Sequence, residues 1–240
     1  MTASTLERPE VTDAAWLRYL AERAAYELAD APASDIVRWA HAAFGDRLAI
    51  ASSMTDAVVI DVVSREVPGL DVLFLDTGYH FVETIATRDA VASLYPVQVR
   101  SIEPDRTVAE QDAEYGPRLH DRDPDLCCAL RKVQPLSRAL APYSAWLTGV
   151  RRADSPERAQ TPVVAFDERR GKVKINPIAT WSDEQLDAYV AEHGVLVNPL
   201  LLDGYGSVGC APCTRRLLPG EHARAGRWAG LAKTECGINT

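Results

Sequence analysis

Three strongly apolar runs, separated by helical patterns, constrain the fold of this chain more than any other feature. They cover residues 47–53 (RLAIASS), 71–77 (DVLFLDT) and 145–150 (AWLTGV), and VQVRS at 97–101 is a weaker fourth. Each run lacks the alternation of a half-buried strand, as expected when both faces of a parallel sheet are covered. Helical patterns follow the first run at 55–67 and the second at 80–95. This order indicates βαβ units, and hence a three-layer α/β/α fold with a mostly parallel sheet.

Helical patterns also occur before the first run, at 13–29 and 34–44, and after the last one. The clearest is TWSDEQLDAYVAEHG, where Ser182 is a candidate N-cap with Gln185 three residues later and Gly194 at the end. Beyond this helix the chain is rich in Gly and Pro and loses periodicity, which predicts loops. We expect N-terminal helices packed on the core (1–45), a nucleotide-binding α/β core (46–200) and a loop-rich C-terminal segment (201–240).

Composition narrows the class of protein. The 240 residues, 47% of them hydrophobic, suffice for one large core. The N-terminal sequence shows no signal peptide, and no stretch approaches the ~20 apolar residues of a membrane span, so we expect a cytoplasmic protein that binds no membrane. A net charge of −8 argues against a nucleic-acid partner. The sequence leaves open whether the protein forms a homo-oligomer.

Polar residues follow three of the apolar runs. They are Ser52 and Ser53 with Asp56, then Asp76, Thr77 and Gly78, and then Gly149 with Arg151 and Arg152. Ligands of open α/β sheets gather at the carboxyl ends of the strands, so these residues predict a nucleotide pocket. The arginines in GVRRADSPER and CTRRLLPGEHARAGR are candidate anion clamps there. Simple helix capping and a solvated surface are the alternative interpretations.

Four of the five cysteines form two pairs. Cys127 and Cys128 are adjacent, and Cys210 and Cys213 form a C-x-x-C motif. In a reducing compartment such thiols are more often ligands than disulfides. Zinc is the common metal for four cysteines, but adjacent residues suit a single tetrahedral ion poorly. A cubane iron–sulfur cluster binds each thiolate at a separate iron, and we favour it over zinc and over unrelated buried cysteines.

The fifth cysteine, Cys236, lies four residues from the end of the chain. A thiolate on a mobile tail could reach into a pocket and then swing out to a partner. Lys233 could lower the pKa of this thiol. An idle exposed thiol is the alternative.

Taken together, the CC pair, the C-x-x-C motif and the terminal ECGI resemble the assimilatory adenylyl-sulfate (APS) and phosphoadenylyl-sulfate (PAPS) reductases, specifically their iron–sulfur branch. LDTGYHFVET, TGVRRADSPERA and ARAGRW fit the same family, over roughly residues 47–239. The resemblance implies an adenine-nucleotide α-hydrolase-like fold, although SSM replaces the SGG loop of the related ATP pyrophosphatases. The family tail commonly has a histidine where this chain has Asn239, so the role of that histidine is open here.

The resemblance implies a role for each of the residues above. Cys127, Cys128, Cys210 and Cys213 would ligate a [4Fe–4S] cluster, and Cys236 would be the nucleophile. Lys132 would lie near both cluster and substrate, and Arg224 and Arg227 would close over the phosphosulfate. Ser52, Ser53, Asp56, Asp76, Thr77, Gly78 and Arg151 would line the nucleotide pocket.

These roles imply reduction of APS to sulfite and AMP through an S-sulfocysteine on Cys236. Because one thiol remains after four bind the cluster, an external dithiol such as thioredoxin would release the sulfite. Cluster cysteines generally accompany APS use in the family, whereas PAPS-specific members generally lack them; a PAPS or dual-specificity reductase is the alternative. An ATP-pyrophosphatase-type adenylating or thiolating enzyme and a non-catalytic zinc or iron–sulfur module are the other rivals.

Overall fold

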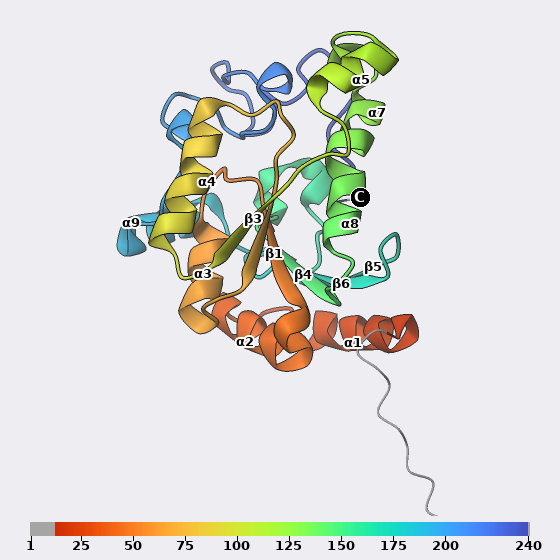
Figure 1. Ribbon diagram of the computed structural model, residues 1–240. Helices are drawn as coiled ribbons and strands as arrows, with labels where there is room; N and C mark the ends of the chain where they lie inside the picture. The colour runs from red at the N-terminus through yellow and green to blue at the C-terminus, as the bar shows by residue number, and fades with distance from the viewer. Residues whose placement is uncertain (1–12, 240) are drawn as a thin grey trace, which may run out of the picture.

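The core of the molecule is a six-stranded sheet with helices on both faces, seen in a computed structural model that describes residues 13–239 (Figure 1). The strand order is β3-β2-β1-β4-β6-β5, and only β5 runs antiparallel to its neighbour. The strands are β1 (Leu48–Ser52), β2 (Asp71–Leu75), β3 (Gln98–Ile102), β4 (Ala145–Thr148), β5 (Val164–Asp167) and β6 (Lys172–Ile175). The expected α/β fold and its four apolar strands are therefore confirmed.

Helices cover the sheet unequally on its two faces. The larger apolar cluster joins one face to α1 (Ala14–Glu27), α2 (Ala33–Phe44), α3 (Val58–Glu66), α4 (Val82–Leu94) and α9 (Asp183–His193). The smaller cluster joins the other face to α8 (Gln134–Ala139). Short helices α5 (Val108–Tyr115), α6 (Leu119–Arg122) and α7 (Pro124–Cys128) lead into α8. In Figure 1, α3 and α4 lie on one side of the sheet, and α7 and α8 on the other.

The two clusters explain why the strands read as unbroken apolar runs. Within β1, Leu48 and Ile50 pack into the larger cluster, whereas Ala49 between them packs into the smaller one. Trp146 of β4 likewise joins Ala49, while Leu147 faces the other side. Because alternate residues are buried on opposite faces, the polar residues of β1 and β4 are confined to the carboxyl ends of these strands, at Ser52 and Thr148.

The β5–β6 hairpin at the sheet edge was not expected from the sequence. Its strands have four residues each and carry charged side chains at Asp167, Lys172 and Lys174. The turn closes where the Gly171 N–H donates to Asp167 O (2.8 Å), with Gly171 at φ +65°. Its strands are thus too short and too polar to stand out as apolar runs.

A π-helical turn lies between the two halves of the helix that carries the adjacent cysteines. Residues Ala129–Val133 form this turn, directly after α7 and before α8. Such turns insert one extra residue per turn and rotate the side chains that follow. Arg131 consequently points to the β2 loop, where its Nε donates to Thr77 O (2.5 Å), while Lys132 points into a cavity.

From Ser182 onward the chain follows the expectations closely. Ser182 caps α9, accepting from the Gln185 N–H (3.2 Å), and Gly194 ends it in the left-handed conformation. Between residue 202 and residue 239 the structure contains loops and one 3-10 turn. No helix in the described part of the chain is long and apolar enough to cross a membrane. The division at residues 45 and 200 stays a prediction, and its first part includes residues 1–12, which lie outside the described residues.

Candidate active site

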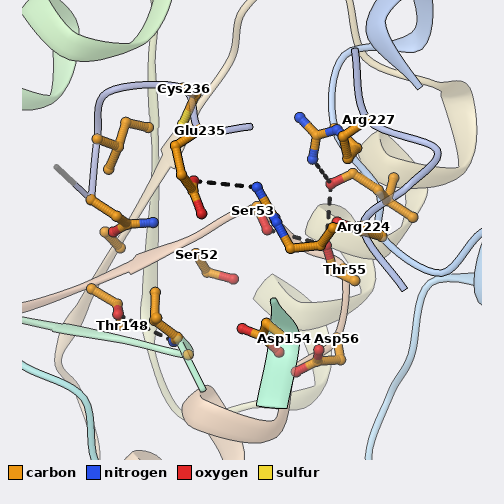
Figure 2. A pocket seen from close by; sticks show the side chains of 18 of the residues that line it. Ser52, Ser53, Thr55, Asp56, Thr148, Asp154, Arg224, Arg227, Glu235 and Cys236 are labelled. Carbon is orange, nitrogen blue, oxygen red and sulfur yellow. Dashed lines mark hydrogen bonds and ion pairs between the residues drawn. The ribbon is translucent and has the colours of Figure 1, made fainter. Parts of the chain in front are cut away.

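A cavity of about 290 Å³ opens at the carboxyl ends of β1, β2 and β4 (Figure 2). It brings together residues from the β1 loop, from the π-helical turn and from the last 40 residues of the chain. The sequence-predicted residues that line it are Ser52, Ser53, Asp56, Thr77, Lys132, Arg151, Arg224, Arg227 and Cys236. Segments nearly 190 residues apart in sequence therefore share one pocket, at the edge of the sheet where ligands of open α/β folds gather.

The β1 loop is held in shape by its own side chains and by Asn198. The Asp56 carboxylate accepts from the Val58 N–H (3.0 Å) at the start of α3, and burial raises the pKa of Asp56. Met54 adopts the left-handed region at φ +58°. Asn198, fully buried, fixes this strained residue because its Nδ2 donates to Met54 O (3.1 Å). Asp56 thus bonds the first residue of α3 beside the cavity that it lines.

Two of the predicted pocket residues, Asp76 and Gly78, do not line the cavity. Asp76 accepts from the Gly78 N–H (3.1 Å) and pairs with Arg88 (3.5 Å). Gly78 has φ +71°, and a Cβ there would lie 3.1 Å from Arg131 Nη2. Both residues shape the turn after β2, which presents Thr77 to the cavity.

The cations of the cavity are largely paired with carboxylates. Arg158 binds Glu235 through two hydrogen bonds (2.6 and 3.0 Å) and contacts Asp154 (2.9 Å). Arg224 reaches the same Glu235 carboxylate at 3.2 Å (Figure 2). Burial alone would raise the pKa of Glu235, but the two guanidinium groups hold it below its ordinary value. Arg151 pairs with Asp154 (3.1 Å) and Asp183 (2.8 Å).

Cys236 follows Glu235 directly and is half-buried in the cavity wall. Burial alone would lower the pKa of Lys132, yet the nearby Cys210 and Cys236 thiols raise it above its ordinary value. The Lys132 ammonium is therefore the cation that faces both cysteines. Lys233 instead pairs with Asp125 and lies over the Trp228 ring (5.5 Å).

The four paired cysteines line a second, smaller cavity of about 10 Å³ behind Lys132. A hydrogen bond from the Ala211 N–H to Tyr79 O (2.7 Å) holds the C-x-x-C loop against the β2 loop. Burial and the neighbouring thiols raise the pKa of Cys127 to about 12. Burial opposes ionisation of Cys210 too, but Lys132 and the Thr77 hydroxyl hold its pKa below the ordinary value.

No group of three or more His, Cys, Asp or Glu side chains in residues 13–239 is arranged to hold one metal ion. The cysteines nevertheless fit a cluster in the chemistry of their side chains. All four thiols border one small cavity, and its other walls combine rings, among them Tyr79 and Trp228, with the cations Arg131 and Lys132. Four thiols are the ligand set that a [4Fe–4S] cluster takes, and nearby cations can offset the negative charge of the thiolates.

Sequence reasoning missed several residues of the site. Arg158 lies in the GVRRADSPER motif, whose arginines are candidate anion clamps, and this membership already indicated a place in the site. Asp154 lies in the same motif and pairs with Arg151 and Arg158, three and four residues away, so its spacing was a signal too. Glu235 directly precedes the candidate nucleophile Cys236, so its position in the sequence also indicated a place in the site. Asn198 gave none, because its partners Met54 and Thr84 are 144 and 114 residues away.

The fold and the site together define an adenine-nucleotide α-hydrolase-like protein with a cysteine in a cation-lined pocket. The family model described as "phosphoadenosine phosphosulfate reductase domain" matches residues 47–216. A relative from Streptomyces coelicolor named adenosine 5'-phosphosulfate reductase is 67% identical, covering 93% of this chain and 94% of the relative. A relative of the same name from Mycolicibacterium smegmatis is 56% identical with the same coverage.

Solved structures agree with these matches. The crystal structure of a phosphoadenylyl-sulfate reductase from Candida auris, a phosphate complex, has a TM-score of 0.69 and 30% identity, covering 81% of this chain and 96% of that one. An FMN adenylyltransferase from Candida glabrata shares the fold alone, with a TM-score of 0.53 and 13% identity over 85% of this chain and 75% of that one. The chain belongs to the phosphoadenosine phosphosulfate reductase family.

Proposed function

We propose that this protein reduces APS to sulfite and AMP in sulfate assimilation, with Cys236 as the nucleophile. The observation that carries the proposal is the position of Cys236, in the wall of a strand-end cavity beside Lys132, Arg224 and Arg227. The two relatives named adenosine 5'-phosphosulfate reductase, at 67% and 56% identity, support APS as the substrate.

The first chemical step is a displacement at sulfur. The Cys236 thiolate attacks the sulfur of the phosphosulfate, the bond from that sulfur to the bridging oxygen breaks, and AMP leaves with the electron pair. Lys132, Arg224 and Arg227 neutralise the charge that develops on the departing phosphate. Ser52, Ser53, Asp56, Thr77 and Arg151 bind the nucleotide, whereas Asp76 and Gly78 shape the turn that carries Thr77.

The second step needs a reductant from outside the chain. A thiolate of an external dithiol such as thioredoxin attacks the Cys236 sulfur, and sulfite leaves with the electron pair. The second thiol of the dithiol then resolves the mixed disulfide and restores the Cys236 thiolate. None of the five cysteines, which all lie within residues 13–239, forms a disulfide, and this is compatible with a reducing compartment.

We also propose that Cys127, Cys128, Cys210 and Cys213 hold a [4Fe–4S] cluster. The enclosed space that the four thiols share supports it, because a cubane takes each thiolate on a separate iron and does not require them to converge on one point. When bound, the cluster would polarise the site next to Lys132, while the two reducing equivalents arrive through thiols.

The activity is tested by supplying APS or PAPS with thioredoxin and measuring sulfite and AMP. We expect sulfite from APS at a clearly higher kcat/KM than from PAPS. Three of the five arginine and lysine side chains that line the cavity, Arg151, Arg158 and Arg224, are already paired with carboxylates. Few cations are therefore left to bind the additional 3'-phosphate dianion of PAPS. A preference for PAPS would overturn the choice of substrate, and release of pyrophosphate from ATP without sulfite formation would overturn the function.

A further inference from the structure

The tail around Cys236 is held on both sides of the nucleophile. Before Cys236, Arg224 Nη2 donates to Thr234 O (3.1 Å), and Glu235 binds Arg158 and Arg224 as described above. After Cys236, Gly237 adopts φ +78° and turns the chain toward the β5–β6 hairpin. The nucleophile therefore lies at the middle of a segment whose two ends are fixed by different parts of the fold.

Every side-chain hydrogen bond that reaches the tail beyond Cys236 comes, in the described residues, from this hairpin. Arg169 donates to Gly237 O (3.0 Å), Arg170 to Ile238 O (3.1 Å) and Lys174 to Asn239 Oδ1 (2.9 Å). Ile238 packs between these contacts on the smaller apolar cluster, which includes Leu136 and Trp146. The end of the chain accordingly lies beside α8 (Figure 1).

The contact between Lys174 and Asn239 is the one best suited to position the tail. Lys174 stands on β6, inside the sheet, where its backbone is fixed by pairing on both sides. Its ammonium lies 5.2 Å from the centre of the Trp146 ring, and burial lowers the pKa of Lys174 to about 8. Asn239 lines the catalytic cavity itself. A donor on a rigid strand thus reaches a side chain three residues from the nucleophile.

We propose that the β5–β6 hairpin is the docking site of the catalytic tail, and that Lys174 and Asn239 are positioning residues that hold Cys236 at the cavity during sulfur transfer. The proposal rests on the function proposed above. It also gives Asn239 a role, because an amide oxygen accepts the same hydrogen bond that a neutral histidine nitrogen would accept. We call the contact between Lys174 and Asn239 the clamp. The docked tail must detach before a dithiol protein can reach the Cys236 sulfur, so the clamp favours the first step and opposes the second.

The first experiment measures the two steps separately in Lys174→Met and Asn239→Ala. With saturating APS and no reductant, formation of the Cys236 adduct should slow about tenfold in each, the scale of one hydrogen bond to a charged group. The double variant should be no slower than either single one. Affinity for AMP should stay within about twofold of wild type, and thioredoxin should reduce the preformed adduct at least as fast as in wild type. Asn239→His should retain the wild-type rate.

Lys172→Met is the matched control. Lys172 belongs to the same strand but donates to the Tyr143 backbone oxygen, so this variant should form the adduct at the wild-type rate. Unchanged adduct formation in Lys174→Met, an equal loss in Lys172→Met, or equal slowing of both chemical steps would overturn the clamp.

The second experiment needs no substrate, and so separates the clamp from the proposed function. Hydrogen exchange of the peptide covering residues 234–239 should accelerate in Lys174→Met and Asn239→Ala but not in Lys172→Met. If wild-type protein forms no adduct from APS, the proposed function fails while this exchange difference still reports on the clamp. Equal exchange in all four proteins would overturn the clamp whatever the activity.

Discussion

At the scale of single residues, the carboxylate next to the nucleophile sets the charge of the pocket. Glu235 accepts hydrogen bonds from Arg158 and forms an ion pair with Arg224, so it occupies two cations that an anionic substrate would otherwise engage. Its pKa is held below the ordinary value, and it remains ionised at neutral pH. Glu235 therefore both anchors the tail and competes with the nucleotide.

Glu235→Gln is expected to change binding and turnover in opposite directions. Loss of one negative charge should tighten AMP binding severalfold, because Arg158 and Arg224 become available to the phosphate. The same loss weakens the anchor before Cys236 and should lower kcat. Titration calorimetry with AMP and steady-state kinetics with APS measure the two effects.

The control for that experiment is Glu221→Gln. Glu221 pairs with Arg215 away from the cavity, so the Glu221→Gln protein should bind AMP with the affinity of wild type. Weaker AMP binding by Glu235→Gln would contradict the assignment of Arg158 and Arg224 to the substrate anion.

Among the helices and strands, one buried amide, that of Asn198, links the β1 loop to α4. Asn198 Nδ2 donates to Met54 O and to Thr84 Oγ1 (both 3.1 Å), and its N–H donates to Thr55 O (3.0 Å). These bonds hold the loop between β1 and α3 against α4. The geometry of Ser52, Ser53 and Asp56 at the cavity depends on that attachment.

Asn198→Ala should therefore lower both stability and nucleotide affinity. Two buried acceptors lose their donor, which costs about 1–3 kcal/mol in the free energy of unfolding. Ser182→Ala is the matched control, because loss of this exposed helix cap costs about 1 kcal/mol without touching the loop. Urea unfolding and AMP titration of both variants test this; wild-type AMP affinity in Asn198→Ala would show that the loop does not depend on the amide.

The sequence predicts those helices and strands whose pattern depends on residues close together in the chain. Apolar runs and the Ser182 cap are local, and the structure confirms the strands and helices they predicted. The β5–β6 hairpin is short and charged, and its stability comes from pairing with β4, which no local pattern shows. Lys132 and the arginines could be singled out by motif, whereas the pairing of Arg158 with Glu235 across 77 residues appears only in the fold.

In the whole molecule, the four paired cysteines come from two parts of the chain that are far apart in sequence and meet at one cavity. Cys127 and Cys128 end α7, while Cys210 and Cys213 begin the loop-rich segment that carries Arg224, Arg227 and the tail. A cluster shared by both pairs would fasten this segment to the core. Binding free energy of a structural metal group is in this sense folding free energy.

Anaerobically purified protein should accordingly be brown and contain about four irons and four sulfides per chain. Removal of the iron by a chelator should accelerate hydrogen exchange across residues 202–239 and abolish activity, while the sheet residues keep their protection. One tightly bound zinc without acid-labile sulfide would replace the cluster by a zinc site, and unchanged exchange after iron removal would contradict the fastening role.

In the proposed reaction, Cys236 carries the sulfur between the two steps. Intact-protein and peptide mass spectrometry after incubation with APS in the absence of reductant tests this role directly. We expect a mass increase equal to one SO₃ group, located on Cys236, absent from Cys236→Ser and removed by thioredoxin with release of sulfite. An adduct on Cys210 or Cys213, or sulfite formation by Cys236→Ser, would contradict it.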